Sequence, residues 1–520
     1  MGERYLDMLE VSQKQAYIFG SNRLRDNIHN SDVIAYITSP EYFKTLPAWN
    51  SVFDEDKNYV YSGGGHTILE FPDKDSAVKF NKAYTRKVRE DFPDIELFVT
   101  VNQYDDKIPP YENLDNLTKK LEKKKSVREA SFHQESFGIE ATDSNTRKPK
   151  SSTPGDVNLP DMYEGLYPSG YDIRKSFEDL GGSRDDKSFI AVVHIDGNGM
   201  GNRVNDFYKS CYDEKADPEA GWQSFKKKVR EFSESIDRDF KTSIKEMMAD
   251  IDNINMQASL DKLDLKSGYF PVRGIIASGD DICFVCDGRI GIECAAKVIE
   301  HLTQKTNSSD KKGYSACAGV AIVHQKYPFY KAYELAEELC SSAKRFGASL
   351  SKDDNGACVS SIDWHIEQGE VSGSLEDIRK DYIAADDTRM ELRPYIVSAP
   401  ADIEKKEENR LYRKFKAVMK EITDAKQDNL RSRLKNIRTS LKAGQKETDY
   451  YITFHKLDDM ISRIYNGVYS ELDITKIGTG ERSNRSPYVE TSDKNKRSVL
   501  FDAAEAIDLY IPVDTEEENK

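Results

Sequence analysis

Apolar positions along the chain follow strand and helix periods in a fixed order that occurs twice. In the first region, residues 4–11 are typical of a strand, and a helical stretch follows from Gln13 with Tyr17, Ile18 and Leu24 on its apolar face. Asn58–Ser62 and His66–Phe71 indicate the two arms of a hairpin, and Asp73–Phe92 carries apolar residues at helical spacing. Glu96–Val101 closes the region as a strand, so the predicted order is strand, helix, hairpin, helix, strand.

The same order returns in the second half of the chain. Phe189–Ile195 is an apolar run, a long helical pattern spans about Trp222–Met248, and two further apolar runs flank a tight turn at Ser278–Asp281. A helix and a strand then follow at Ile290–Leu302 and Tyr314–Val323. Two units with this order predict an internal repeat of ferredoxin-like β-α-β-β-α-β domains, called palms below.

These patterns predict an α+β fold of two ferredoxin-like palm domains and an α-helical C-terminal domain. We expect a catalytically inactive first palm over residues 1–105 and a polar linker or small insertion domain over 106–186. The second palm, with the active site, is predicted over 187–385, and the Lys/Glu-rich helical domain over 386–520.

Two acidic motifs about eighty residues apart point to the chemistry. Asp196 ends an apolar strand and is followed by Gly197-Asn198-Gly199-Met200-Gly201, while Ser278-Gly279-Asp280-Asp281 lies between two apolar runs. Hard carboxylate oxygens are the ligands that Mg²⁺ shares with substrate phosphates, and two metals can clamp an in-line displacement. Asp196, Asp280 and Asp281 are therefore the predicted catalytic and metal-holding residues, with two Mg²⁺ or Mn²⁺ ions as cofactor.

Glycines beside the carboxylates allow the backbone to approach phosphate and to open a helix N-terminus toward it. The predicted nucleotide-binding positions of this region are Gly197, Asn198, Gly199, Gly201, Ser278 and Gly279. Taken alone, Ser-Gly-Asp-Asp is an ordinary polar turn and the glycine segment an ordinary loop. Both together, each at the end of an apolar strand, favour a palm-type nucleotidyltransferase site.

Composition narrows the class of protein. The chain has 520 residues and a formal net charge of -15, which argues against a general, unassisted nucleic-acid binder. Its seven cysteines are scattered and odd in number, as in a reducing cytoplasm, and Cys283 and Cys286 would face opposite sides of one strand. No stretch is apolar enough to cross a membrane, so we expect a cytoplasmic protein without membrane contact.

The motifs resemble the palm polymerase/cyclase large subunit of type III CRISPR effector complexes. The resemblance rests on Val192–Gly201 and Ser278–Asp281, with support from Tyr314–His324, Gln15–Arg25 and Tyr61–His66. It implies conversion of ATP into cyclic oligoadenylate second messengers in antiviral defence. By motif position it implies that Asp196, Asp280 and Asp281, with the neighbouring Ile195, hold the metals. Lys344, an exposed helix lysine on its own pattern, would contact the triphosphate.

Three departures from the family indicate a reduced version. Ser278-Gly279 stands where the family has a glycine pair, no His-Asp dyad of an HD-type nuclease precedes the first palm, and Phe137–Lys150 lacks zinc-binding cysteines. The implied partners are ATP together with either other CRISPR effector subunits and guide or target RNA, or a second copy in a stand-alone homodimer. A diguanylate-cyclase-like enzyme using GTP and a catalytically silent nucleotide-binding scaffold subunit are the alternatives.

The first palm repeats the glycine turn without its acids. Gly63, Gly64, Gly65 and His66 occupy the equivalent hairpin tip and are the predicted acceptor-nucleotide site, while an ordinary hairpin turn with an exposed histidine explains them equally well. His194 is expected to be a neutral, packed histidine rather than a catalytic one, because phosphoryl transfer needs mainly positioning and charge neutralisation.

Overall fold

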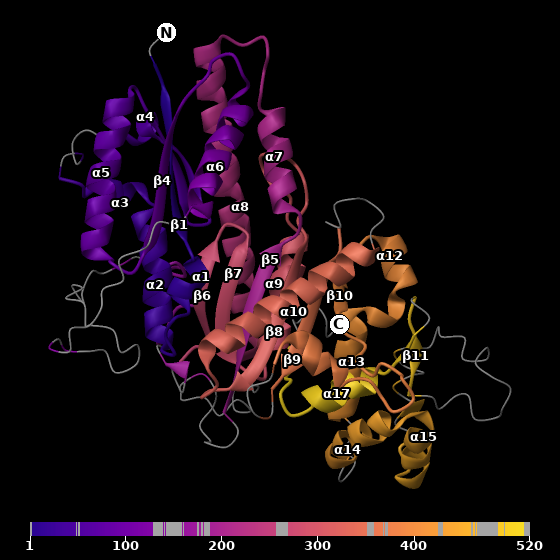
Figure 1. The fold of residues 1–520 in the computed structure, drawn as a ribbon. Helices are drawn as coiled ribbons and strands as arrows, with labels where there is room; N and C mark the ends of the chain where they lie inside the picture. The colour runs from indigo at the N-terminus through magenta and orange to yellow at the C-terminus, as the bar shows by residue number, and fades with distance from the viewer. Residues whose placement is uncertain are drawn as a thin grey trace.

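The computed structural model describes most of the chain, with several gaps. Described are residues 3–127 except 48 and 50–52, then 161–173, 188–255, 269–350, 358–367, 373–424, 430–458, 487–492 and 495–513, with isolated positions between them. Phe137–Lys150, where the sequence lacks zinc-binding cysteines, lies outside the described residues apart from two isolated positions. Figure 1 shows two sheets and a helical region arranged in chain order from indigo to yellow.

The first sheet has four antiparallel strands in the order β2-β3-β1-β4, the strand order of a ferredoxin-like fold. Its strands are β1 (Tyr5–Ser12), β2 (Tyr59–Gly63), β3 (His66–Phe71) and β4 (Glu96–Gln103). The helices of this palm are α1 (Lys14–Ile18), α2 (Leu24–Ile37), α3 (Pro40–Lys44), α4 (Glu55–Asn58) and α5 (Lys74–Asp91). The predicted strand, helix, hairpin, helix, strand order is confirmed.

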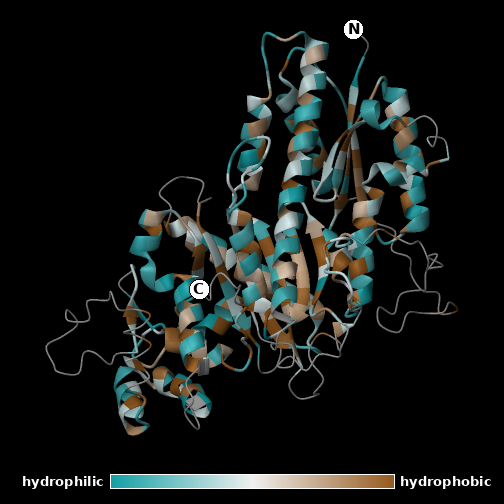
Figure 2. Cartoon of the chain, turned by 180° about the vertical axis from the view of Figure 1, so that it is seen from behind, coloured by the Kyte–Doolittle hydropathy of each residue, from teal (hydrophilic) through white to brown (hydrophobic). Residues whose placement is uncertain are grey.

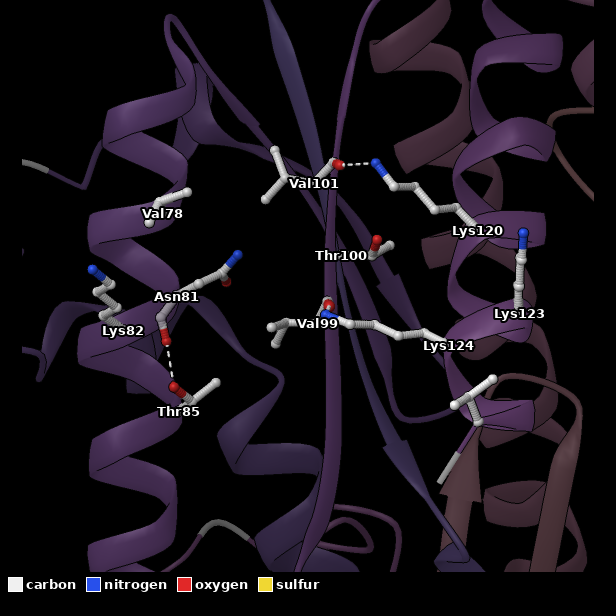
Figure 3. Close-up of a pocket in the computed structure, with 11 residues that line it drawn as sticks. Val78, Asn81, Lys82, Thr85, Val99, Thr100, Val101, Lys120, Lys123 and Lys124 are labelled. Carbon is white, nitrogen blue, oxygen red and sulfur yellow. Dashed lines mark hydrogen bonds between the residues drawn. The ribbon is translucent and has the colours of Figure 1, made fainter. Parts of the chain in front are cut away.

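A further helix, α6 (Pro110–Ser126), follows in the segment predicted to be a linker and packs on β4 and β1. Since β4 is an edge strand, its outer edge lies between α5 and α6, as Figure 3 shows. Lys120 and Lys124 donate hydrogen bonds to the main-chain oxygens of Val101 and Val99, at 2.7 and 2.9 Å. An edge strand whose main-chain oxygens are covered by a neighbouring helix in this way is disfavoured from pairing with a foreign strand.

The second sheet has six strands in the order β10-β9-β8-β5-β7-β6, and its β8-β5-β7-β6 part repeats the ferredoxin-like order. The strands are β5 (Phe189–Gly197), β6 (Val272–Ser278), β7 (Asp281–Asp287), β8 (Ala316–His324), β9 (Ser360–Ile366) and β10 (Tyr395–Ser398). The parallel strand β9 and the antiparallel β10 extend this palm beyond the repeat. Figure 2 shows hydrophobic colour on the strands and mixed colour along the helices, as expected for sheets covered by amphipathic helices.

The helices of the second palm are α7 (Met200–Ser210), α8 (Pro218–Asn255), α9 (Gly291–Thr303) and α10 (Phe329–Leu350). The 38-residue α8 extends over both palms, packing on β2 of the first and on α9 and β6 of the second. Near its start, Lys226 Nζ contacts Glu70 at 3.1 Å and Trp222 Nε1 donates to the same carboxylate at 3.0 Å. Both side chains are buried, so this helix fixes one palm against the other.

The C-terminal region is mainly helical and packs beside β9 and β10. Its elements are α11 (Leu375–Lys380), α12 (Ala401–Lys406), the 3₁₀ helix η4 (Glu408–Arg410), α13 (Tyr412–Asp424), α14 (Leu430–Ala443), α15 (Gln445–Phe454), β11 (Val489–Glu490), β12 (Lys496–Arg497) and α17 (Val499–Ala506). The predicted fold class of palms plus a helical region is confirmed. No helix in the described parts has both the length and the apolar character to cross a membrane.

Tyr163, in the segment between the two palms, packs into the second palm. Its ring is fully buried against Gly274 of β6, and its hydroxyl donates to the main-chain oxygens of Ile276 and Cys283, at 2.8 and 3.1 Å. A Cβ placed on Gly274 would lie 2.2 Å from the ring. Only glycine therefore allows this close approach.

Replacing Gly274 by alanine should expel the Tyr163 ring and break both hydrogen bonds. We expect a loss of at least about 3 kcal/mol in unfolding free energy, from overpacking and from unsatisfied groups. Urea unfolding of the variant measures this loss. Gly201→Ala is the matched control, because nothing lies within 4 Å of its added Cβ; equal stability of both variants would contradict the packing role of Tyr163.

Candidate active site

The predicted catalytic carboxylates meet at one end of the second sheet. Asp196 near the end of β5 lies directly opposite Asp281, the first residue of β7, and opposite Cys317 of β8. Asp280 occupies the β6–β7 turn next to them. Cross-strand neighbours have Cβ atoms only about 4.5–5.5 Å apart, so the strand register itself brings the acidic groups together.

The turn between β6 and β7 has two residues, Gly279 and Asp280. Gly279 has a φ of 63°, which an L side chain rarely adopts, and its N–H donates to Asp237 Oδ1 at 3.1 Å. On the facing strand, a Cβ on Gly197 would lie 3.0 Å from the Asp280 Cβ and 3.3 Å from its Oδ2. Two of the predicted glycines thus provide the turn and the space that Asp280 needs.

The clustered charges raise the proton affinity of the acids. Burial, followed by the neighbouring charge of Asp196, raises the pKa of Asp280 to about 7. Burial also raises the pKa of Asp281, with His194 opposing the shift and Asp196 adding to it. A cation that neutralises these crowded carboxylates therefore stabilises them.

Lys344 of α10 is the cation already present. Its ammonium donates to Asp196 Oδ2 and to the main-chain oxygen of Gly197, the latter at 3.2 Å. Burial lowers the pKa of Lys344, but the Asp196 charge and hydrogen bond outweigh it, and the net shift is upward. Lys344 is thus a half-buried partner of the acidic cluster, and not the exposed helix lysine that its local pattern suggests.

The other predicted positions have different surroundings. Asn198 is held by the scaffold, because its Nδ2 donates to the main-chain oxygen of Val359 at 2.9 Å. Gly199 has a φ of 64° and directly precedes α7, whose first turn contains Gly201. Ile195 is fully buried in β5, so only its main-chain oxygen is a polar group suited to a metal. Ser278, half-buried, pairs with Asp281 at the base of the turn.

Two side chains that the sequence analysis did not place in the site, His194 and Tyr333, lie beside Asp281. His194 Nδ1 lies 3.6 Å from Asp281 Oδ1, and the imidazole, buried as expected, packs edge-on against the ring of Tyr333. Tyr333 belongs to α10, one of whose apolar positions it occupies in the sequence. Because His194 precedes Asp196 by two residues on one strand, both point to the same face, which a period-2 argument could have indicated.

The glycine turn of the first palm has a defined shape. Gly64 and Gly65 both have positive φ, 57° and 77°, as in the type I′ turn of a two-residue hairpin. His66 is half-buried beside the turn, with Nε2 3.2 Å from the Tyr61 hydroxyl, so it is not an exposed turn residue. Burial lowers the pKa of His66 to about 4, and the Lys14 ammonium adds to the shift.

Helix α8 links the two turns through one pair of residues. Ser233 Oγ donates to the main-chain oxygen of Ser62 in the first palm, at 3.1 Å. Asp237, one helical turn later, accepts from Gly279 N–H in the second palm, also at 3.1 Å. Residues four apart on a helix are about 5–6 Å apart, so the glycine turn and the acidic turn lie close together.

Lys14 adds a second link. Its ammonium donates to the main-chain oxygen of Gly64, and its charge opposes the rise that burial causes in the pKa of Asp281. The next residue, Gln15, reaches α10, where its Nε2 donates to Glu337 Oε1 at 2.9 Å and to the Tyr333 hydroxyl at 3.3 Å. Sequence patterns did not indicate Ser233 and Asp237, because a polar pair four residues apart is common on a solvated helix face.

The carboxylate oxygens of this site suit a divalent metal, although the side chains are not arranged as a complete set of ligands. Carboxylate oxygens are the ligands that Mg²⁺ prefers, and Asp281 Oδ1 is buried without a hydrogen-bond partner among the described residues. In that same part of the chain, no group of three or more His, Cys, Asp or Glu side chains is close enough to hold an ion. Asp196 is instead paired with Lys344, and the metal ligands stay a prediction.

Comparison with known proteins agrees with this geometry. Residues 189–353 match the family model described as Cas10/Cmr2, second palm domain. The match begins at the first residue of β5 and extends just past α10, so it contains all three carboxylates and Lys344. The part of the second sheet formed by β5, β6, β7 and β8, with its helices, is therefore a palm domain of this type. A comparison with curated proteins gave no match.

Solved structures with the same fold are CRISPR proteins. Csm1 of T. onnurineus is 14% identical, with a TM-score of 0.53, and the likeness covers 97% of this chain and 70% of that one. The Csm1–Csm4 cassette in complex with cA4 is 14% identical with a TM-score of 0.52 and the same coverage. The cassette in complex with cA3 is 13% identical with a TM-score of 0.52, over 98% of this chain and 70% of that one.

The likeness to these structures concerns the fold. Together with the family match, it confirms the resemblance expected from the sequence. Residues 189–353 are thus a palm domain of the Cas10/Cmr2 type, and the chain as a whole has the fold of the Csm1 structures.

The raised pKa of Asp280 predicts how stability depends on pH. Because its pKa in the folded chain is about 7 against an ordinary 3.8, the folded chain holds more protons than the unfolded chain between these values. The contribution of Asp280 to folding stability is therefore lost as pH rises through that window. Asp280→Asn should raise the melting temperature of the metal-free protein at about pH 8, and raise it much less near pH 4.

Thermal melts in a chelating buffer at both pH values measure this effect. Asp106→Asn, at an exposed position shortly after β4, is the control for loss of one negative charge. An equal shift at both pH values, or no stabilisation near pH 8, would contradict the charge crowding at Asp280.

Proposed function

We propose that this chain is a metal-dependent nucleotidyltransferase that converts ATP into cyclic oligoadenylate-type second messengers. The observation that carries the proposal is the meeting of Asp196, Asp280 and Asp281 at one sheet end, beside the glycine turn of the first palm. A Cas10/Cmr2-type second palm and a fold shared with Csm1–Csm4 cassettes in complex with cA4 and cA3 support it.

Two Mg²⁺ or Mn²⁺ ions held by these three carboxylates, with the Ile195 position beside them, would neutralise the triphosphate and align the attacking and leaving oxygens. The chain itself supplies position and charge. Lys344 balances Asp196 in the ligand-free chain, and once that carboxylate is neutralised by other means, the ammonium can contact a phosphate oxygen. Gly197, Gly199 and Gly201 carry no side chains, so the main chain at the start of α7 can approach a phosphate closely at these positions.

The first palm would hold the acceptor nucleotide. Gly63, Gly64, Gly65 and His66 form the turn that α8 brings beside the acidic turn, and the nearest atom to an added Cβ on Gly64 is 4.0 Å away. Open space over a glycine backbone suits a closely approaching ligand. The turn has no carboxylate at its tip, so it would bind a nucleotide without performing the chemistry.

We further propose that the chain works with other subunits of an effector complex, because its fold is shared with Csm1 in Csm1–Csm4 cassettes. A GTP-using, diguanylate-cyclase-like enzyme remains the enzymatic alternative, and a silent nucleotide-binding scaffold the other one. The three carboxylates and their shared position support catalysis over the scaffold.

Replacing Asp280 and Asp281 together by alanine should abolish product formation while the fold is retained, because the cation ligands are lost but no buried contact of the core is broken. The measurement is product analysis with each labelled nucleoside triphosphate in Mg²⁺ or Mn²⁺, with melting temperature as the fold check. Asp196→Asn should lose activity nearly as completely, since an amide keeps the shape without the charge.

The same assay separates the three functions. Oligoadenylates from ATP that vanish in the double variant support the proposal, and products from GTP alone would favour the cyclase alternative. Wild-type protein without product, in the presence of its partner subunits and target RNA, would favour the scaffold. Normal turnover by the double variant would remove these carboxylates from the active site.

Gly64→Asn should block synthesis while metal-dependent ATP binding at the second palm is kept. Asparagine tolerates a φ of 57° better than other side chains, so the fold should survive, whereas the side chain fills the space above the turn. Gly64→Val should block synthesis too, with an added loss of stability. Gly165→Asn is the matched control, because Gly165 has a φ of 77° and nothing within 4 Å of its added Cβ. Full synthesis by Gly64→Asn would refute the two-site arrangement.

A further inference from the structure

An open groove runs along the outer edge of the first sheet, between α5 and α6. Its volume is about 650 Å³, and the edge strand β4 forms its floor (Figure 3). Valines of α5 and β4 give it an apolar lining, and its charged residues are Lys82, Lys120, Lys123 and Lys124. No acidic residue is among the described residues that line it. We call it the edge groove.

The lysines of the edge groove differ from other lysines of α6 in their lack of a carboxylate partner. Lys119 pairs with Asp115 at 2.6 Å and Lys125 with Glu10 at 2.9 Å, and both lysines lie outside the groove. None of the groove lysines has an ion pair within the part of the chain that the structure describes. Like charges gathered in one groove without counter-charges favour an anionic partner.

Two main-chain oxygens on the open edge of β4 are covered by these side chains. Lys120 donates to the Val101 oxygen and Lys124 to the Val99 oxygen, as described above. Four residues of a helix advance about 6 Å and two residues of a strand about 6.6 Å, so the lysines match alternate positions of the strand. A strand laid along this edge would replace both ammonium contacts by main-chain hydrogen bonds.

Asn81 adds an unused acceptor at the base of the groove. Its side chain points from α5 toward β4 in Figure 3 and is only 8% exposed. Its Nδ2 donates to Asp7 Oδ1 at 3.0 Å, whereas its Oδ1 is buried without a hydrogen-bond partner among the described residues. Burial raises the pKa of Asp7 to about 7 against the opposing effects of Asn81 and Lys124, so this carboxyl offsets little of the lysine charge at neutral pH.

We propose that the edge groove binds an extended, acidic segment of a partner protein, which adds a strand to β4. Main-chain N–H groups of the segment donate to the oxygens of Val99 and Val101. Its carboxylates accept the ammonium groups of Lys120 and Lys124 that the strand displaces. Because side chains alternate along a strand, one face of the segment meets α5 and the other meets α6.

The lysine cover makes the edge selective. A neutral or basic strand would break two charged hydrogen bonds and leave the ammonium groups without a new partner, whereas an acidic strand supplies one. Single-stranded nucleic acid shares the negative charge, but the described lining has no aromatic side chain on which a base could stack. The apolar lining and the open main-chain edge therefore favour a peptide. The proposal goes beyond the nucleotide chemistry of the palms, and it holds or fails whether or not the acidic site is active.

The test measures binding of fluorescent probes to the full chain by anisotropy, in a chelating buffer at constant ionic strength. The acidic probe is an eight-residue peptide of alternating valine and glutamate. Two matched peptides replace every glutamate by glutamine or methylate every main-chain nitrogen of the acidic peptide, and an octauridylate represents nucleic acid. The test variant combines Lys120→Gln with Lys124→Gln. The control variant combines Lys79→Gln with Lys119→Gln, which removes the same charge from exposed positions of α5 and α6 outside the groove.

We expect the acidic peptide to bind the wild-type protein and the control variant equally. The glutamine peptide and the methylated peptide should bind about tenfold more weakly, because the first lacks carboxylates and the second has no N–H to donate. The test variant should bind the acidic peptide at least about fivefold more weakly, since two surface ion pairs are lost, and its melting temperature checks that the fold is retained.

Four results would overturn the proposal. Absent binding of the acidic peptide, or equal binding by the test and control variants, removes the groove as its site. Equal binding of the methylated peptide excludes strand addition. Tighter binding of the octauridylate, weakened in the test variant, identifies nucleic acid as the occupant. A wild-type dimer in sedimentation that the test variant does not form identifies a second copy of the chain instead.

Discussion

The antiparallel register between β5 and β7 is the constraint on which the candidate site depends. It sets Asp196 opposite Asp281 and leaves Asp280 in the two-residue turn beside them. Since side chains alternate along a strand, a slip of one residue would send Asp196 to the opposite face and bury a charge in the apolar core. The flanking positions of β5 and β7 are fully buried hydrophobic residues, so the core itself penalises that slip. One strand register therefore both packs the core of the sheet and brings the carboxylates together.

The second requirement is that the palms keep a fixed relation, and α8 provides it. Lys226 and Trp222 secure its first turns to Glu70 of the first palm, while later turns pack on α9 and β6. Between these anchors, Ser233 contacts the glycine turn and Asp237 the acidic turn. A helix is stiff over such a short span, so the distance between the turns follows from one helical repeat. A two-nucleotide reaction between the palms needs this kind of fixed spacing.

Charge crowding has a cost in the ligand-free chain. Burial and the charge of Asp196 raise the pKa of Asp280, and Lys344 neutralises only part of the cluster. Because negative charge remains in excess, the acidic cluster is more stable with divalent cations and their bound phosphates than in the ligand-free chain.

The sequence by itself determined the elements and the acidic motifs. Periodicity predicted the repeated strand–helix order, because each element needs one apolar face, and the carboxylates stood out because a strand followed by Asp and glycine is a local pattern. Only the tertiary structure decided the contacts between residues that are far apart in the sequence, because local patterns do not contain them. It paired Lys344 with Asp196 across 148 residues, brought Ser233 and Asp237 of α8 to two different turns, and gave His66 the Tyr61 hydroxyl as a partner. Such contacts depend on which faces meet when the elements pack, and in the sequence each of these residues resembles an ordinary polar position on the surface of its own element.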